Sequence, residues 1–281
     1  KKPEIPLNQT QKNALEALKK APGATKLLHG VTGSGKTNIY LKMAKNALLA
    51  QKSTILLVPE IALTGQLVRV FGEVFGDKVV LIHSGQTEAE RHLIFEKILE
   101  AEEPLIVVGP RSALFAPVAE LGLIIIDEEH ETTYKSETSP KYHARDIARW
   151  KCARGNATLL LASATPSIES YAKAMEGKYT LVKLKERFGG AELPEVQIYD
   201  MRNEQRMGNL SPMGRLLKEK LKEVTERDEQ AILFLNRRGY NTSVSCKSCG
   251  DVITCPHCSI SMNYHTKKGG YDQGFLFCHW C

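Results

Sequence analysis

A glycine-rich segment, Gly-Val-Thr-Gly-Ser-Gly-Lys-Thr, runs from Gly30 to Thr37 between a short apolar run and an amphipathic helical pattern. Gly, four residues and then Gly-Lys-Thr is the spacing of a loop whose backbone amides surround the phosphates of a nucleoside triphosphate. Its glycines permit the tight turn that brings these amides inward. The segment therefore predicts a strand, a phosphate-binding loop and a helix in that order, which favours an α/β fold.

We expect the Lys36 ammonium to contact the β and γ phosphates of ATP and the Thr37 hydroxyl to bind Mg²⁺. Gln11 has two interpretations. It lies three residues after Asn8, the predicted N-cap of the first helix, as in a capping box. Its amide is equally suited to read the Hoogsteen edge of an adenine. The predicted ATP-binding residues are Gln11, Gly30, Gly33, Ser34, Gly35, Lys36 and Thr37.

Short apolar runs recur after this loop, most of them separated by segments long enough for a helix. They cover residues 53–58, 78–82, 105–108, 123–126 and 158–161, and a second helix is predicted over 38–50. Continuous apolar strands that alternate with helices predict a parallel sheet with helices on both faces. Ligands of such sheets bind beyond the carboxyl ends of the strands.

An acidic motif, Asp127-Glu128-Glu129-His130, directly follows the run at 123–126. A carboxylate that emerges from a buried strand after a phosphate loop is suited to hold Mg²⁺, and we assign this role to Asp127. Glu128 is placed to polarise the attacking water as a general base. Lys36, Asp127 and Glu128 are thus the predicted catalytic residues. The alternative is an acidic strand end that is satisfied by a helix N-terminus.

The segment 131–146 interleaves aromatic and basic residues next to this motif. Tyrosine and histidine rings can stack on unpaired bases while nearby cations contact phosphates. The alternative is a solvated loop whose tyrosines pack partly on the core. The stacking candidates are Tyr134, Tyr142 and His143, and the phosphate candidates are Lys135, Lys141 and Arg145.

Six of the seven cysteines form three Cys-x-x-Cys pairs, Cys246/Cys249, Cys255/Cys258 and Cys278/Cys281. The start of the chain shows no apolar signal segment, so we expect a cytoplasmic protein whose cysteines bind metal instead of forming disulfides. Two such pairs complete a tetrahedral zinc site. Six thiolates do not divide into sites of four, and redox-active dithiols are the alternative.

These motifs together resemble a known family. Residues 11–165 are similar to the first motor lobe of the superfamily two helicases, which have RecA-like folds. The resemblance is carried by residues 57–64, 109–117, 127–130, 163–167 and 234–240 and by the cysteine pairs that follow, and it narrows to the primosomal replication-restart helicases. It implies ATP-driven 3′-to-5′ translocation on single-stranded DNA at forks. It also implies two interleaved zinc ions held by four cysteine pairs in the full-length protein.

The resemblance further implies roles for individual residues. Segments 59–64, from Pro59 to Thr64, and 109–112, with Arg111 and Ser112, would lie against the DNA backbone. Ser163 and Thr165 would couple the nucleotide state to DNA contact, and the aromatic segment would sense DNA. Cys255/Cys258 and Cys278/Cys281 would share one zinc ion, while Cys246/Cys249 would await a further pair.

Glycines and a proline within 187–194 predict a linker there. The resemblance implies that residues 1–186 form the first RecA-like lobe, that 195–242 form the start of a second RecA-like lobe, and that 243–281 form an incomplete zinc module inserted in it. Within the second lobe we predict strands over 195–201 and 231–235. Between them we predict a helix over 213–226, with Ser211 as its N-cap and Pro212 in its first turn.

The net charge of +6 argues only weakly for a polyanionic partner. No apolar run approaches the roughly 18 residues of a membrane span. By resemblance, the expected partners of a monomer are single-stranded and forked DNA, single-stranded DNA-binding protein and helicase-loading proteins of the primosome. The chain ends before the second-lobe arginines of such motors, so we expect it to bind nucleotide, hydrolyse it weakly and not unwind DNA. Another P-loop NTPase and a non-enzymatic zinc-dependent DNA-binding module are the competing hypotheses.

Overall fold

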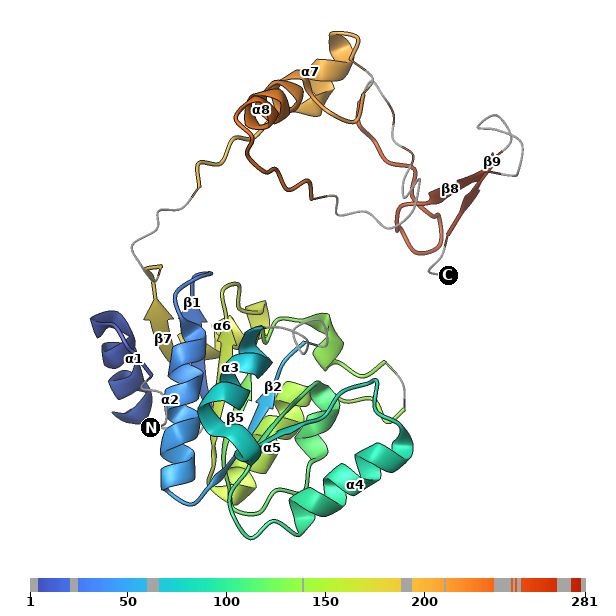
Figure 1. The fold of residues 1–281 in the computed structure, drawn as a ribbon. Helices are drawn as coiled ribbons and strands as arrows, with labels where there is room; N and C mark the ends of the chain where they lie inside the picture. The colour runs from blue at the N-terminus through green and yellow to red at the C-terminus, as the bar shows by residue number, and fades with distance from the viewer. Residues whose placement is uncertain are drawn as a thin grey trace. The chain divides into compact units, whose positions relative to one another are not determined.

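The computed structural model describes residues 5–20, 25–59, 66–137, 139–187, 194–209, 211–234, 244, 246, 249–266 and 274–278. The predictions made for Thr64, for Cys281 and for linker residues 188–193 lie outside these ranges. The chain divides into two compact units, Lys1–Leu193 and Pro194–Cys281, and each is described by itself (Figure 1).

The first unit is built on a parallel sheet of seven strands in the order β3-β4-β2-β5-β6-β1-β7. Its strands are β1 (Thr25–Gly30), β2 (Ser53–Leu57), β3 (Val79–Leu81), β4 (Ile106–Gly109), β5 (Leu121–Ile126), β6 (Thr158–Ser163) and β7 (Thr180–Leu184). Its α-helices are α1 (Gln9–Lys20), α2 (Lys36–Leu49), α3 (Gln66–Phe75), α4 (Glu88–Leu99), α5 (Ala144–Gly155) and α6 (Ile168–Met175). Short 3₁₀ turns are η2 (Gly76–Lys78), η3 (Arg111–Phe115) and η4 (Thr132–Tyr134).

Two hydrophobic clusters lie on opposite faces of this sheet. Successive strand residues point to opposite faces, so Leu27 belongs to one cluster and Leu28 to the other. Side chains of α1, α2 and α3 pack in the cluster of Leu28, and side chains of α4, α5 and α6 pack in that of Leu27. Both faces are therefore covered by helices (Figure 1), which is why the strands are apolar at consecutive positions.

The sequence predictions for the first unit are confirmed at the level of its elements. Each of the five apolar runs forms a parallel strand, and the helices predicted near Asn8 and over 38–50 are present as α1 and α2. The edge strand β7 was not predicted. Its sequence, Thr-Leu-Val-Lys-Leu, contains an exposed Lys183, because an edge strand is only partly covered, and this interrupts the apolar run.

Within its described residues, the second unit has the helices α7 (Met201–Arg206) and α8 (Arg215–Glu226) and an antiparallel hairpin of β8 (Asn263–Thr266) with β9 (Gly274–Phe277). The predicted strands over 195–201 and 231–235 are wrong: 195–200 and 231–234 have no regular structure, and Met201 begins α7. A strand pattern becomes a strand only where a neighbouring strand supplies hydrogen bonds. Helix α8 begins after Gly214, so Ser211 is not its N-cap.

A carboxylate organises the helical part of the second unit. Glu204 of α7 is 1% exposed and accepts hydrogen bonds from Tyr199 Oη (2.6 Å), Asn209 Nδ2 (2.5 Å) and the backbone and side chain of Arg215 (3.1 and 3.2 Å). The Asn209 and Tyr199 hydrogen bonds lower the pKa of Glu204 to about 2. Glu204 therefore links the start of α8 to the residues around α7.

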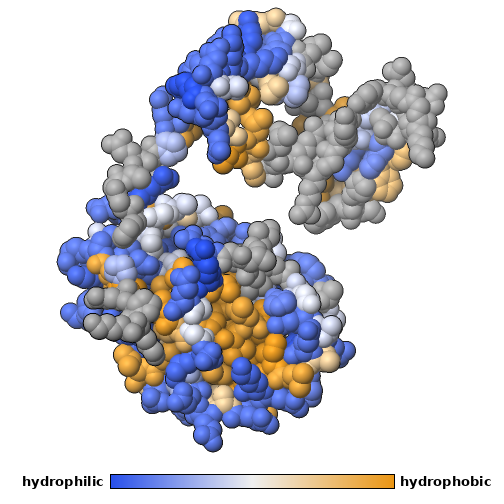
Figure 2. Space-filling view, viewed as in Figure 1, coloured by the Kyte–Doolittle hydropathy of each residue, from blue (hydrophilic) through white to orange (hydrophobic). Residues whose placement is uncertain are grey.

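The surface differs between the two units. On the face shown in Figure 2, hydrophilic residues dominate over α7 and α8, and no residue of α8 is buried. On the first unit, apolar residues gather in the area of α3 and α4 with hydrophilic residues around them (Figure 2). None of the described helices is long and apolar enough to cross a membrane.

Candidate functional site

The loop between β1 and α2 carries the predicted phosphate-binding residues. Gly33 and Gly35 have φ angles of 78° and 75°, in the left-handed region that glycine adopts without strain. Gly35 directly precedes α2, and no side chain caps this helix start. The first backbone amides of α2 are therefore directed at any anion bound in the loop, which the helix dipole also favours.

A cavity of about 530 Å³ adjoins this loop. Its lining comes from the loop residues Thr32 to Thr37, from Tyr40 of α2, and from Asp127 and Glu128 after β5. The carboxyl ends of β1 and β5 thus bring the phosphate loop and the acidic motif to one site, although the two lie far apart in the sequence. All three predicted catalytic residues line this cavity.

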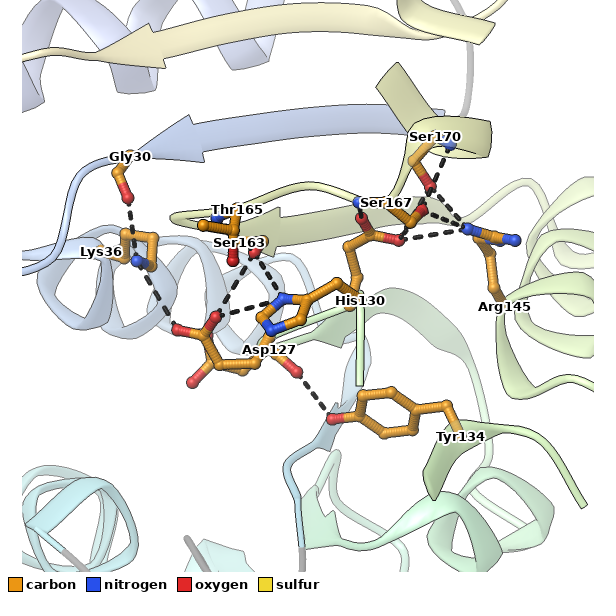
Figure 3. Close-up of polar contacts among 12 residues, drawn as sticks. Gly30, Lys36, Asp127, His130, Tyr134, Arg145, Ser163, Thr165, Ser167 and Ser170 are labelled. Carbon is orange, nitrogen blue, oxygen red and sulfur yellow. Dashed lines mark hydrogen bonds and ion pairs between the residues drawn. The ribbon is translucent and has the colours of Figure 1, made fainter. Parts of the chain in front are cut away.

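The Lys36 ammonium lies between the loop and the acidic motif (Figure 3). Its Nζ donates to the Gly30 carbonyl at 3.0 Å and is 3.8 Å from Glu128 Oε1, and the side chain is 11% exposed. Because the ammonium is largely shielded from water, its electrostatic contacts are stronger than those of an exposed lysine. This position suits an ammonium that neutralises phosphate oxygens beside a carboxylate.

Asp127 follows β5 directly and is held from two sides. Its backbone N–H donates to the Leu57 carbonyl of β2 at 2.9 Å, and the Tyr40 hydroxyl donates to its Oδ1 at 2.7 Å. Burial raises the pKa of Asp127, the Tyr40 hydrogen bond opposes this rise, and the neighbouring Glu128 adds to it. Burial and Asp127 itself raise the pKa of Tyr40, so the hydroxyl keeps its proton and remains a donor. Tyr40 was not predicted from the sequence.

Glu128 adopts a left-handed backbone conformation with φ of 44°, which is uncommon for residues other than glycine and is often found at functional sites. Its carboxylate faces three polar groups: Oε1 is 3.8 Å from Lys36 Nζ, while Oε2 accepts from Ser163 Oγ at 3.4 Å and is 3.6 Å from His130 Nδ1. The strained turn therefore aims a half-buried carboxylate into the cavity.

The ends of β5 and β6 are joined by a short hydrogen-bond chain. His130 Nδ1 and Ser163 Oγ are 2.8 Å apart, and Ser163 Oγ accepts from the Thr165 backbone N–H at 2.9 Å (Figure 3). Ser163 is fully buried and Thr165 is exposed. A movement of the Thr165 backbone can therefore reach the Glu128 carboxylate through Ser163, which hydrogen-bonds to both residues.

Gln11 takes the capping role and also touches the loop. Its side-chain Oε1 accepts from the Asn8 N–H at 3.0 Å, and its own N–H donates to Asn8 Oδ1 at 2.8 Å. Its Nε2 donates to the carbonyls of Ser34 (3.1 Å) and Gly35 (3.4 Å). The buried amide therefore fixes the phosphate loop against α1, and both of its ends are engaged by the protein itself.

The structure corrects the prediction for Arg145. The sequence suggested a phosphate contact, but Arg145 is 8% exposed and its Nη1 lies 3.2 Å from Glu129 Oε2. The same nitrogen donates to the hydroxyls of Ser167 and Ser170, each at 2.8 Å. The guanidinium faces Ser167 and Ser170 (Figure 3), and it supplies the charged partner that the buried Glu129 carboxylate needs.

Glu129 is the centre of that cluster. Its side chain is fully buried, and it accepts from the Ser167 N–H (2.6 Å), the Ser167 hydroxyl (3.1 Å) and the Ser170 hydroxyl (2.8 Å). No role of Glu129 was predicted from the sequence. A third acid directly after a buried strand, with an arginine in a nearby helix, was the signal that could have identified it.

Tyr134 is also corrected. Its ring is 1% exposed and its hydroxyl donates to the Asp127 carbonyl at 2.7 Å, so it is buried and unavailable for stacking on a base. Burial raises its pKa. His143 instead caps α5, accepting from the Arg145 N–H at 3.2 Å. Tyr142 is half-buried in an edge-to-face contact with Phe115, while Lys135 and Lys141 are exposed.

Arg111 and Ser112 follow β4 and line a second cavity, of about 550 Å³, together with Tyr134 and Lys135. Pro59 lies after β2, one residue beyond Val58, which lines the same cavity. Four of the predicted DNA-contacting residues thus line this cavity, although Tyr134 is almost fully buried in its wall, while Lys141 is exposed elsewhere and Arg145 is buried against Glu129.

Three of the predicted zinc ligands come together. The Sγ atoms of Cys255, Cys258 and Cys278 lie within 4.8 Å of one another, and those of Cys258 and Cys278 are 3.4 Å apart. Three thiolates at this spacing fit three corners of a tetrahedral zinc site. Cys281, the predicted fourth ligand, is outside the described residues, and Cys246 and Cys249 do not belong to this group.

Comparison with known proteins agrees with this architecture. The model of the DEAD/DEAH box helicase family matches residues 8–174. Replication restart protein PriA of Bacillus subtilis is 47% identical over 281 residues, which cover 99% of this chain and 34% of that protein. PriA of Synechocystis is 43% identical and covers 98% of this chain and 34% of its own length. The chain therefore spans about a third of the length of these curated relatives.

Among solved structures, RecG bound to a three-way DNA junction aligns with 80% of this chain and 32% of its own, at 22% identity and a TM-score of 0.49. That likeness is too partial to bear on function.

Proposed function

The chain belongs to the DEAD/DEAH box helicase family, and we propose that it forms the ATP-binding part of a DNA helicase that acts in replication restart. The observation that carries the proposal is the convergence of Lys36, Asp127 and Glu128 on the cavity of the phosphate loop. The names of the PriA relatives support the place in replication restart. Translocation from 3′ to 5′ and action on forked DNA are part of the proposal.

The donor set of the first cavity fits a magnesium nucleotide. It combines a shielded ammonium, helix-start amides, the Thr37 hydroxyl and carboxylate oxygens. The amides and Lys36 would hold the phosphates, and Thr37 and Asp127 would hold Mg²⁺. When bound, Mg²⁺ neutralises charge on the β and γ phosphate oxygens. Tyr40 keeps the Asp127 carboxylate oriented through its hydrogen bond.

Glu128 is proposed as the residue that orients the attacking water and accepts its proton. Its carboxylate points into the cavity from a strained turn and is fixed by Ser163 and His130. General-base assistance of this kind contributes about 10²–10⁴-fold in rate. Ser163 and Thr165 would couple DNA binding to the position of this carboxylate through the hydrogen bonds that join the ends of β5 and β6.

The proposed DNA contacts are Pro59, Thr64, Arg111, Ser112, Lys135, Lys141 and Tyr142. Tyr142 would stack on a base, and contacts of the others to the DNA backbone would position a strand without reading its sequence. By the same proposal the full-length protein is a cytoplasmic monomer with two zinc ions, and it acts on single-stranded and forked DNA with single-stranded DNA-binding protein and primosome proteins. This chain alone would bind nucleotide and hydrolyse it weakly.

Nucleotide binding by this chain tests the first step. Lys36→Ala is expected to weaken binding of a fluorescent magnesium ATP analogue by about tenfold or more, because a hydrogen bond to a charged group is lost. Lys45→Ala removes the same charge farther along α2, away from the cavity, and should leave the affinity unchanged. Equal affinities for Lys36→Ala and wild type would contradict the site. Unwinding of forked against blunt duplex DNA by the longer protein tests the helicase proposal.

Substitution of a predicted zinc ligand tests the cysteine module. Cys255→Ser is expected to lower the zinc content of the purified chain by about one ion per molecule, because a closed structural site needs all four ligands. The seventh cysteine, Cys152, is buried in α5 among apolar residues and serves as the control, so Cys152→Ser should keep the zinc. Zinc content by atomic absorption is the measurement, and a full complement in Cys255→Ser would refute the assignment.

A further inference from the structure

A buried tyrosine faces the carboxylate that we propose as a magnesium ligand. Tyr40 of α2 is fully buried, its ring packs in the hydrophobic cluster that contains Leu28, and its hydroxyl lies 2.7 Å from Asp127 Oδ1. Both residues border the nucleotide cavity. A ring that is enclosed by close-packed neighbours cannot turn away from its partner without opening the core. The hydroxyl is therefore a fixed donor at one of the two carboxylate oxygens.

Helical spacing places this donor beside the phosphate loop. Tyr40 follows Lys36 by four residues in α2, so the two side chains leave the same face of the helix. One turn earlier, Lys36 Nζ donates to the Gly30 carbonyl. One face of α2 thus supplies a cation for phosphate oxygens and a neutral donor for the Asp127 carboxylate. A phenylalanine ring would fill the same volume in the core, so packing by itself does not require the hydroxyl.

The backbone of Asp127 is held as well as its side chain. Its N–H donates to the Leu57 carbonyl at 2.9 Å, and its own carbonyl accepts from the Tyr134 hydroxyl at 2.7 Å. Together with the Tyr40 hydroxyl, these contacts fix the residue at its N–H, its carbonyl and its carboxylate. The carboxylate is therefore presented to the cavity in one orientation and is not free to rotate toward a bound ion.

This rigidity affects which divalent ion the site accepts. Mg²⁺ requires near-ideal octahedral geometry and is usually held by one or two carboxylates and by phosphates of the substrate. Ca²⁺ is larger, takes about six to eight oxygens, and is bound by carboxylates through one or both oxygens in flexible sites. Discrimination between the two ions depends on the number and the flexibility of the ligands. A fixed carboxylate with a donor at one oxygen therefore suits Mg²⁺ better than Ca²⁺.

We propose that Tyr40 determines the preference of the nucleotide site for Mg²⁺ over Ca²⁺, because it keeps the Asp127 carboxylate in one orientation with one oxygen for the ion. The inference rests on the ATP-binding function proposed above, and it adds a specificity role for a residue outside the phosphate-loop and acidic motifs. Tyr40 acts through Asp127, so it is a positioning residue and not a ligand of the ion.

The test measures how tightly this chain binds a fluorescent, hydrolysis-resistant ATP analogue with saturating Mg²⁺, with saturating Ca²⁺, and without divalent ions. The wild-type chain is expected to bind the Mg²⁺ complex more tightly than the Ca²⁺ complex. Tyr40→Phe keeps the ring and removes the hydroxyl. It is expected to reduce the ratio of the two affinities by about tenfold, because a hydrogen bond to a charged group is lost. The affinity without divalent ions should not change, because Lys36 and the loop amides are intact.

Tyr179→Phe is the matched control. Tyr179 is 4% exposed and does not line the nucleotide cavity, and within the described part of the chain its hydroxyl has no hydrogen-bond partner. This variant should keep the wild-type ratio. Asp127→Ala tests the route of the effect, because Tyr40→Phe should not change the ratio further in that background. The unfolding temperature of each variant, followed by circular dichroism, shows whether it is folded.

The outcomes separate the inference from the function beneath it. Equal affinities of the wild-type chain for the Mg²⁺ and Ca²⁺ complexes would overturn the inference without any variant and leave ATP binding intact. An unchanged ratio in folded Tyr40→Phe would overturn it too, as would equal reductions in Tyr40→Phe and Tyr179→Phe. A further change of the ratio in the Asp127→Ala background would refute the action through Asp127. Absence of nucleotide binding by the wild-type chain under all three conditions would overturn the proposed ATP-binding function together with the inference.

Discussion

Replacement of Glu128 by Gln is expected to slow ATP hydrolysis by about 10²–10⁴-fold, because the amide cannot accept the proton of the attacking water. The carboxylate lies 3.8 Å from the Lys36 ammonium, and its removal leaves that cation more attractive to phosphates. Nucleotide affinity should therefore be retained or increased. Steady-state hydrolysis with single-stranded DNA, together with the affinity for a fluorescent ATP analogue, measures both effects in the longer protein that we propose carries this chain.

The matched control is Glu131→Gln, which removes an equal charge a few residues away without a contact to Lys36 or Ser163 in the described structure. It should hydrolyse ATP like wild type. Hydrolysis by Glu128→Gln at more than a tenth of the wild-type rate would show that another group activates the water. Loss of nucleotide binding in that variant would show that Glu128 serves binding instead.

Replacement of Glu129 by Ala is expected to lower the free energy of unfolding of the first unit by about 3–5 kcal/mol, because removal of one partner leaves Arg145 buried without its counter-charge. The two serine hydroxyls and the Ser167 N–H lose their shared acceptor at the same time. Chemical denaturation, followed by circular dichroism, measures the change. Glu131→Ala, at a partly exposed position nearby, should shift the free energy by no more than about 0.5 kcal/mol.

A double-mutant cycle separates the pair from its surroundings. Arg145→Met should also be strongly destabilising, since it leaves the Glu129 carboxylate buried. The double variant Glu129→Ala/Arg145→Met should be less destabilised than the sum of the single changes, because neither charge is then left alone. Strict additivity would mean that the 3.2 Å contact between Glu129 and Arg145 contributes no coupling.

Much of the first unit was accessible from the sequence. Its strands are recognisable because burial on both faces makes their residues apolar at consecutive positions, as at Leu123–Ile126. The second unit was less predictable. Val196 and Ile198 alternate as in a strand, yet they are 80% and 96% exposed and have no regular structure around them. Alternation of apolar and polar residues makes a strand possible, but a strand also requires a neighbouring strand to supply its hydrogen bonds.

The candidate functional site also has a part that could be predicted from the sequence and a part that could not. The sequence alone determined the strand, loop and helix around Gly30–Thr37 and the acids after β5, because spacing along the chain sets which groups leave a strand or begin a helix. Only the tertiary structure decided that Arg145 pairs with Glu129, that Tyr134 is buried under Asp127 and that the Tyr40 hydroxyl donates to the Asp127 carboxylate. The physical reason is that the burial and partners of a charged or aromatic side chain depend on segments that meet only through folding.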